Sequence, residues 1–185
     1  FDTCNITPGT KFMEDMNKYI KNYYKNNEKV ILSLTDEPGE GEHKIFDYIR
    51  DNMSYHINTT TLIYGLDADL IMLCLNHIDV CPNIYLYRET PEFIKHLDDT
   101  LEPNKDYLLN ICRLADKISL KLTNNEKLNM NVIHDYILLC FFLGNDFMPH
   151  FPALNIRRNG IDILMEVYNK CKCDDNEFRL VNKRE

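Results

Sequence analysis

The acidic residues with the spacing of a shared chemical site fall in three short segments. Glu40 and Glu42 alternate with glycines, Asp67 and Asp69 flank one alanine, and Asp146 follows Gly-Asn. Carboxylate oxygens are the ligands that hard cations such as Mg²⁺ and Mn²⁺ prefer. If the fold brings these segments together, the sequence predicts a site for divalent cations.

Each segment also has a plain structural interpretation. Glu40 and Glu42 can lie in a surface loop, with Glu42 favoured by the dipole of the helix that follows. The pair Asp67 and Asp69 forms a short, common motif that also occurs in sugar-nucleotide transferases. Asp146 can be an Asx-turn residue that closes a helix. The combination of the three segments is therefore more informative than any one of them.

The first half of the chain predicts alternating strands and helices. The expected strands are Val30–Leu34, Thr60–Leu66 and Asn83–Tyr87, and the expected helices are Thr10–Asn26, His43–Met53 and Leu70–His77. This order favours an α/β fold with a mostly parallel sheet flanked by helices and connected by right-handed crossovers. Ligands bind at the carboxyl ends of parallel strands, so both acidic pairs are expected at that edge.

The second half of the chain predicts mainly helices. Tyr107–Leu122, Val132–Leu143 and Gly160–Lys170 carry helical spacing, and Cys171–Glu185 is expected to be a polar tail. We interpret residues 1–185 as one partial catalytic domain, with an α/β part over 1–100, a helical part over 101–170 and the tail over 171–185.

Composition restricts the classes of protein that are possible. The apolar runs are far shorter than the roughly 20 residues of a membrane span, so no membrane is expected. The 29 acidic and 21 basic residues give a formal charge of −8, which argues against a nucleic-acid partner unless bound cations reverse the local charge. Seven cysteines without a paired C-x-x-C spacing favour free thiols in a reducing compartment, the cytoplasm or the nucleus.

The motifs closely resemble the N-terminal conserved region of Xrn-type 5′→3′ exoribonucleases, relatives of the flap endonucleases with a PIN-like nuclease core. The resemblance is carried by Ile6–Thr10, Pro38–Lys44 (PGEGEHK), Tyr64–Leu73 (YGLDADLIML) and Asp135–His150 (DYILLCFFLGNDFMPH). Weaker similarity at Leu86–Glu89 and Tyr107–Ser119 extends it over most of residues 1–170.

The resemblance implies that Glu40, Glu42, Asp67, Asp69 and Asp146 match the family's metal ligands. It implies two Mg²⁺ ions, with Mn²⁺ as a substitute, and hydrolysis of RNA that bears a 5′-monophosphate.

Basic residues near these motifs are candidates for contact with the RNA backbone. They are His43, Lys44, Arg157 and Arg158, and the alternative for each is that it simply faces solvent.

The resemblance also implies an earlier segment with two further metal-binding aspartates and a basic pocket for the 5′-phosphate. That segment would precede Phe1, so the remainder of the same protein is an expected partner and the isolated chain is expected to be inactive or very weak. Two alternatives are a flap-type structure-specific endonuclease, which the motif PGEGEHK disfavours, and a non-catalytic RNA-binding scaffold.

Overall fold

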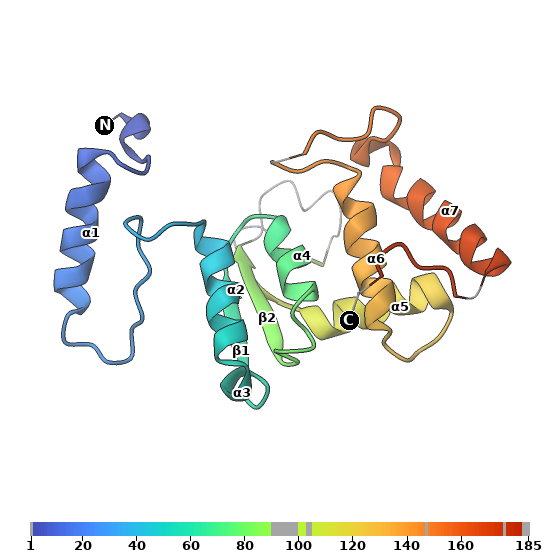
Figure 1. Cartoon of the computed structure of the whole chain (residues 1–185), viewed down its shortest axis with the longest axis horizontal. Coiled ribbons are helices and arrows are strands. Elements are labelled where there is room, and N and C mark those ends of the chain that lie inside the picture. The colour runs from blue at the N-terminus through green and yellow to red at the C-terminus, as the bar shows by residue number, and fades with distance from the viewer. Residues whose placement is uncertain (1, 90–99, 103–104, 147, 176, 183–185) are drawn as a thin grey trace. The chain divides into compact units, whose positions relative to one another are not determined.

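The chain forms two compact units in the computed structural model, Phe1–Asp51 and Asn52–Glu185. The structure describes residues 2–89, 100–102, 105–146, 148–175 and 177–182 (Figure 1). Across these ranges, none of the helices combines the length and the apolar character that crossing a bilayer requires.

The first unit contains a 3-10 turn η1 (Thr3–Asn5) and two helices, α1 (Lys11–Tyr24) and α2 (Gly41–Asp51). The side chain of Thr10 accepts a hydrogen bond from the backbone N–H of Met13 and caps α1. Both helices expected in this region are therefore confirmed, with shifts of a few residues at their ends.

The strand expected at Val30–Leu34 is wrong, because the structure has no strand there. The segment instead leads into a turn, in which the N–H of Glu37 donates to the carbonyl of Leu34 at 3.1 Å. β-branched and aliphatic residues favour a strand only where a neighbouring strand pairs with them. Here the carbonyl of Leu34 accepts hydrogen bonds from the N–H of Glu37 and from the ammonium group of Lys44 rather than from a neighbouring strand.

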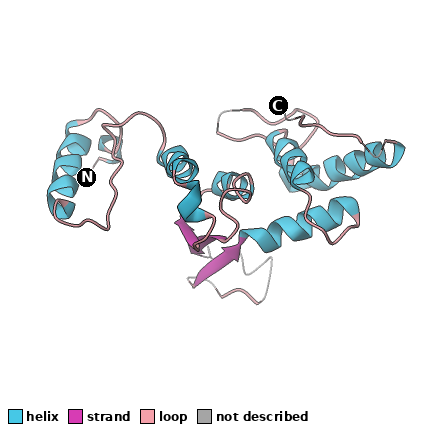
Figure 2. Cartoon of the chain, turned by 60° about the horizontal axis from the view of Figure 1, so that its bottom comes forward, coloured by secondary structure: helices cyan, strands magenta, loops and turns pink. Residues whose placement is uncertain are grey.

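The second unit contains a three-stranded sheet in the order β1-β2-β3, and Figure 2 draws its strands in magenta. The strands are β1 (Thr61–Tyr64), β2 (Ile84–Glu89) and β3 (Asp106–Asn110). β1 runs parallel to β2, as expected, but β3 is antiparallel to β2. The described sheet is therefore mixed rather than mostly parallel, and the α/β class with flanking helices is confirmed.

The helices of the second unit follow the expected order with two corrections. They are α3 (Met53–His56), α4 (Asp69–Leu75), α5 (Ile111–Thr123), α6 (Met130–Phe141) and α7 (Gly160–Asp174), with a 3-10 turn η3 (Ile156–Arg158) before α7. The helix expected from Tyr107 begins only at Ile111, because β3 precedes it and the side chain of Asn110 caps it. α7 runs on through Asp174, so the first residues of the expected tail are helical.

The core of the second unit lies between the sheet and its helices. Ile63, Ile84 and Leu86 are buried on one face of the sheet, where α4 and α5 pack against β2. Removing such a side chain from water contributes about 1.5–3 kcal/mol. This packing fixes the position of α4 at the carboxyl end of β1, where the second acidic pair lies.

Candidate metal centre

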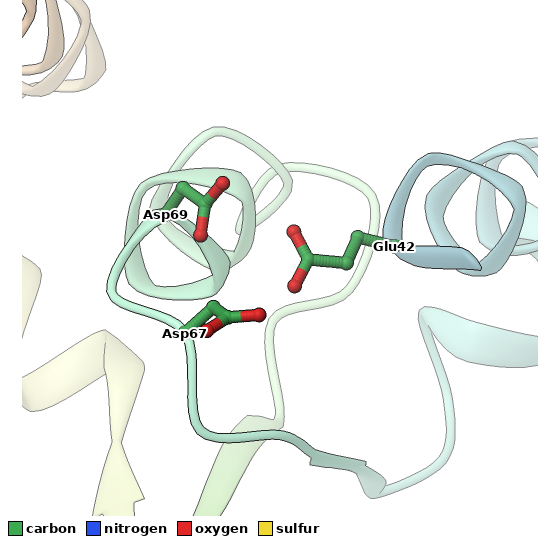
Figure 3. Close-up of side chains that lie close together, drawn as sticks. All are labelled: Glu42, Asp67 and Asp69. Carbon is green, nitrogen blue, oxygen red and sulfur yellow. The ribbon is translucent and has the colours of Figure 1, made fainter. Parts of the chain in front are cut away.

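Asp67 and Asp69 lie at the transition from the end of β1 to the start of α4. Asp67 is exposed in the connecting loop, and Asp69 is half-buried in the first turn of α4. One carboxylate oxygen of each lies within 4.8 Å of the other (Figure 3). Two negative groups this close repel each other unless a cation or a proton lies between them. The pair is therefore a natural binding point for a cation.

The loop before Asp67 is held in place by the neighbouring strand. The guanidinium of Arg88 on β2 donates to the carbonyl of Leu66, and the N–H of Gly65 donates to the carbonyl of Tyr87 at 3.4 Å. A Cβ atom at Gly65 would lie 2.1 Å from Cδ1 of Leu70, so the close packing of this loop favours glycine. Arg88 falls in the weakly similar segment Leu86–Glu89, but nothing in its spacing links it to the loop of another strand.

Asp146 lies in a tight loop after α6. Gly144 has φ +87°, a value that glycine adopts without the strain that other residues incur. The side chain of Asn145 accepts from the N–H of Met148 at 2.8 Å, and the N–H of Asn145 donates to the carbonyl of Met148 at 2.9 Å. These two bonds between Asn145 and Met148 close a tight turn, and the exposed Asp146 lies within that turn.

The second unit brings its three predicted aspartates to one cavity. Asp67, Asp69 and Asp146 all line a cavity of about 390 Å³. The rest of the lining is mostly apolar or aromatic, and includes Met72, Tyr136, Cys140, Phe141, Leu143, Ile156 and Ile161. Two segments far apart in the sequence thus line the same cavity, but the three aspartates are not a set whose carboxylate oxygens all lie within 4.8 Å of one another.

Glu40 and Glu42 lie at the start of α2 in the first unit. Glu40 is exposed and immediately precedes the helix, and its carbonyl accepts from the N–H of Lys44 at 3.1 Å. Glu42 is half-buried in the first turn of α2, and Figure 3 includes its side chain. The preceding Gly39 has φ +100°, so the chain turns sharply just before the two glutamates.

The four basic candidates differ in their surroundings. Nε2 of His43 lies 3.8 Å from a carboxylate oxygen of Glu40, and both side chains are exposed. The ammonium group of Lys44 donates to backbone carbonyls of its own unit. Arg157 and Arg158 are exposed in η3, next to the cavity residue Ile156. Contact of these residues with RNA stays a prediction.

The donor set indicates which cations the cavity suits. Its three aspartates offer only carboxylate oxygens, which suit Mg²⁺ and Mn²⁺ better than softer metals. The chain is thus an α/β protein with an acidic site of the kind that hard cations favour.

Comparison with known proteins gives the family. A model described as XRN 5′-3′ exonuclease N-terminus matches residues 1–90, and one described as Xrn1 helical domain matches residues 127–184. The first range contains Glu40, Glu42, Asp67 and Asp69, and the second contains Asp146. The chain belongs to the Xrn 5′-3′ exonuclease family.

Individual relatives agree with this assignment. The chain is 34% identical to 5′-3′ exoribonuclease 2 of Arabidopsis thaliana, in an alignment that covers 99% of the chain and 22% of that protein. It is 38% identical to 5′-3′ exoribonuclease 1 of Schizosaccharomyces pombe, over 92% of the chain and 14% of that protein. For 5′-3′ exoribonuclease 1 of Saccharomyces cerevisiae the identity is 34%, over 92% and 12%. The chain spans less than a quarter of the length of each of these relatives.

Proposed function

We propose that the chain is part of the catalytic region of a 5′→3′ exoribonuclease that degrades 5′-monophosphorylated RNA by two-metal hydrolysis. The observation that carries this proposal is that Asp67, Asp69 and Asp146 line one cavity. It is supported by relatives that are named 5′-3′ exoribonucleases. The same proposal includes a PIN-like core, in which the sheet of the second unit takes part.

The residues present fit a pair of Mg²⁺ ions, with Mn²⁺ as a substitute. We propose that Glu40 and Glu42 are ligands of these ions, together with the three aspartates. Bound Mg²⁺ would supply an activated water and stabilise the leaving oxygen.

The role of the five carboxylates is to fix the position of the cations and, through them, of the scissile phosphate. Divalent charge at the carboxylates also overcomes the formal charge of −8 that the chain presents to RNA. Arg157 and Arg158, in the turn that begins with the cavity residue Ile156, are the proposed contacts to the RNA backbone.

The experiment uses the full-length protein and an Asp67→Ala variant. With Mg²⁺, the wild-type protein should digest 5′-monophosphorylated RNA processively and leave 5′-hydroxyl RNA largely intact. Asp67→Ala should abolish turnover while the circular dichroism spectrum stays unchanged. Asp79→Ala, which removes an exposed aspartate after α4, is the matched control and should keep full activity.

Each contrary result has a definite meaning. Near-normal activity of Asp67→Ala would show that the metal assignment is wrong. Equal digestion of 5′-monophosphorylated and 5′-hydroxyl RNA would refute selection of the 5′ end. Cleavage of branched DNA in preference to RNA would indicate a flap-type endonuclease, and RNA binding without cleavage would indicate a scaffold.

Two further parts of the proposal concern the rest of the protein and its location. We propose that the remainder of the same protein supplies further metal ligands and a pocket for the 5′-phosphate, so that the 185-residue chain alone has little or no activity. We also propose a cytoplasmic or nuclear location, which the seven free cysteines favour.

A further inference from the structure

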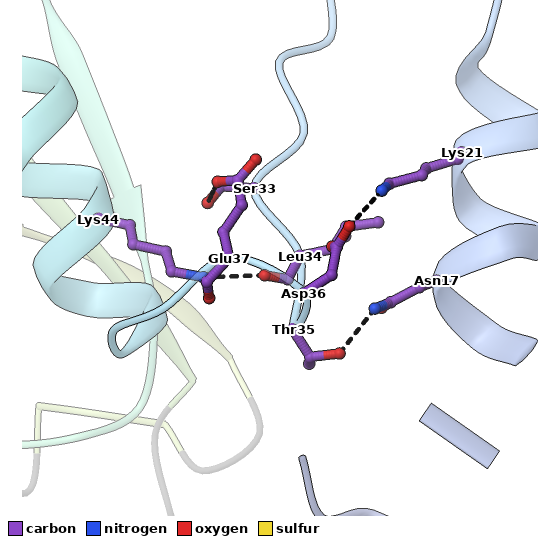
Figure 4. A network of polar contacts seen from close by, with 8 residues as sticks. All are labelled: Asn17, Lys21, Ser33, Leu34, Thr35, Asp36, Glu37 and Lys44. Carbon is purple, nitrogen blue, oxygen red and sulfur yellow. Dashed lines mark hydrogen bonds and ion pairs between the residues drawn. The ribbon is translucent and has the colours of Figure 1, made fainter. Parts of the chain in front are cut away.

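The segment that precedes the two glutamates contains a turn held by a lysine. The N–H of Glu37 donates to the carbonyl of Leu34 at 3.1 Å and closes the turn. The ammonium group of Lys44, on the first turns of α2, donates to the carbonyl of Leu34 at 2.9 Å and to that of Glu37 at 2.7 Å (Figure 4). Lys44 thus binds both ends of the turn at once.

The middle of the same turn is held by α1. Nδ2 of Asn17 donates to Oγ1 of Thr35 at 2.7 Å, and Nζ of Lys21 lies 2.5 Å from Oδ2 of Asp36 (Figure 4). Asn17 and Lys21 are four residues apart, so they lie on one face of the helix. The hydrogen bond from Lys21 lowers the pKa of Asp36 and thus favours its ionised form.

The path from the turn to the glutamates is short. Only Pro38 and Gly39 separate Glu37 from Glu40. The ring of Pro38 fixes its φ, and Gly39 turns the chain with a φ of +100°. The position of the turn therefore determines the direction in which the chain enters α2.

We propose that Lys44 is a positioning residue, which holds the turn of residues 34–37 so that Glu40 and Glu42 present their carboxylates to a divalent cation. The inference rests on the proposed function and gives Lys44 a role other than contact with RNA. Two of the three N–H donors of this ammonium group are already directed at carbonyls, at 2.9 and 2.7 Å, so moving the group toward a phosphate would stretch these bonds.

The test compares Lys44→Met with Lys44→Arg in the full-length protein. Lys44→Met keeps the aliphatic stem and removes the donors, whereas Lys44→Arg keeps donors that can reach carbonyl oxygens. The control is Lys18→Met, which removes the same charge from an exposed lysine on α1 whose partner is Asp15 at 3.6 Å. Mn²⁺ binding is measured by calorimetry, and RNA binding is measured in EDTA at several salt concentrations.

Loss of a residue that orients metal ligands weakens metal binding by about 10- to 100-fold. We expect a loss in that range for Lys44→Met, a loss below about threefold for Lys44→Arg, and none for Lys18→Met. RNA affinity in EDTA and its salt dependence should stay unchanged. The Mg²⁺ concentration for half-maximal activity should rise, with the maximal rate recovered at saturating Mg²⁺.

Two results would overturn the inference. One is unchanged Mn²⁺ affinity in Lys44→Met. The other is weaker RNA binding with a salt slope reduced by about one, which is typical of a lost phosphate contact. If the wild-type protein binds Mn²⁺ and degrades RNA, and Lys44→Met has the same Mn²⁺ affinity, only this inference is refuted. If the wild-type protein does not bind Mn²⁺, the proposed function is refuted as well. If Lys44→Met does not fold, the milder Lys44→Gln is measured in the same way and decides the question.

Discussion

A buried carboxylate on α6 gives a sharp test of how the second unit is held together. Asp135 has 0% of its surface exposed. It accepts hydrogen bonds from the hydroxyl of Tyr168 on α7 at 2.7 Å and from the N–H groups of Leu180 and Val181 at 3.0 and 2.8 Å. We expect Asp135→Ala to release the segment that carries Leu180 and Val181 from α6.

The magnitude follows from these three bonds. A hydrogen bond to a charged group contributes about 1.5–3 kcal/mol, so Tyr168→Phe should cost about 2 kcal/mol. In Asp135→Ala the buried hydroxyl and two N–H groups lose their acceptor, but water can reach the N–H groups once the segment moves. We therefore expect a loss of about 4 kcal/mol rather than the full sum of three such bonds.

Native-state hydrogen exchange measures this loss locally, even in a protein of several domains. About 4 kcal/mol corresponds to an exchange rate about 1,000-fold higher for the N–H groups of Leu180 and Val181. The control is Asp162→Ala, which removes an exposed carboxylate 3.2 Å from Lys121 and should change these rates little. Acceleration below about tenfold in Asp135→Ala would refute the reasoning, because the three bonds would then contribute almost nothing.

Three further predictions follow from individual side chains. Gly144→Ala should lower the free energy of unfolding by about 1–3 kcal/mol and reduce turnover, because its Cβ atom would lie 2.7 Å from a backbone nitrogen of the same loop. The matched control is Gly9→Ala, where φ is a similar +86° and the space around the Cβ position is open. Equal melting temperatures of the two variants would contradict the clash at Gly144. Arg88→Met should weaken Mn²⁺ binding about tenfold by calorimetry, because it removes the donor to the carbonyl of Leu66, which immediately precedes Asp67. Unchanged binding would show that the loop keeps its conformation without Arg88. Burial raises the pKa of the Cys74 thiol from 9.0 to about 12, so mass spectrometry should find it unalkylated at pH 9 while the exposed Cys4 reacts; equal reaction would contradict this. Because the folded-state pKa is raised, the stability that this thiol contributes is full below about pH 9 and is lost as pH rises toward 12.

The fold was predictable where local pattern and pairing agree. β1 and β2 were expected because apolar, β-branched runs there are bounded by turn residues, and they do pair with each other. β3 was missed because Tyr107, Leu108 and Leu109 continue the apolar spacing of α5, and only a partner strand distinguishes the two structures. One signal was present, since Asn110 is a good helix cap and marks where the helix begins.

The acidic residues of the candidate site could be singled out from the sequence, but the bonds that support them could not. Carboxylates near strand ends and glycines can be read from the sequence, and the structure joins Asp67, Asp69 and Asp146 in one cavity. The supports are bonds from Arg88 and Lys44 to backbone carbonyls. A carbonyl has no sequence signature, because every residue carries one.

The turn of residues 34–37 is oriented from the α1 side by contacts that water can reach. α1 buries none of its described residues, and the side chains of Lys21 and Asp36 are 54% and 49% exposed. An exposed ion pair of this kind contributes about 0–1 kcal/mol and weakens as salt is added. Raising the ionic strength is therefore expected to change the positions of Glu40 and Glu42 indirectly, by weakening the ion pair that orients the turn before them. A buffer that weakens the proposed RNA binding by screening phosphates would also loosen the positions of the two glutamates, so a salt titration of the proposed activity would combine two separate effects.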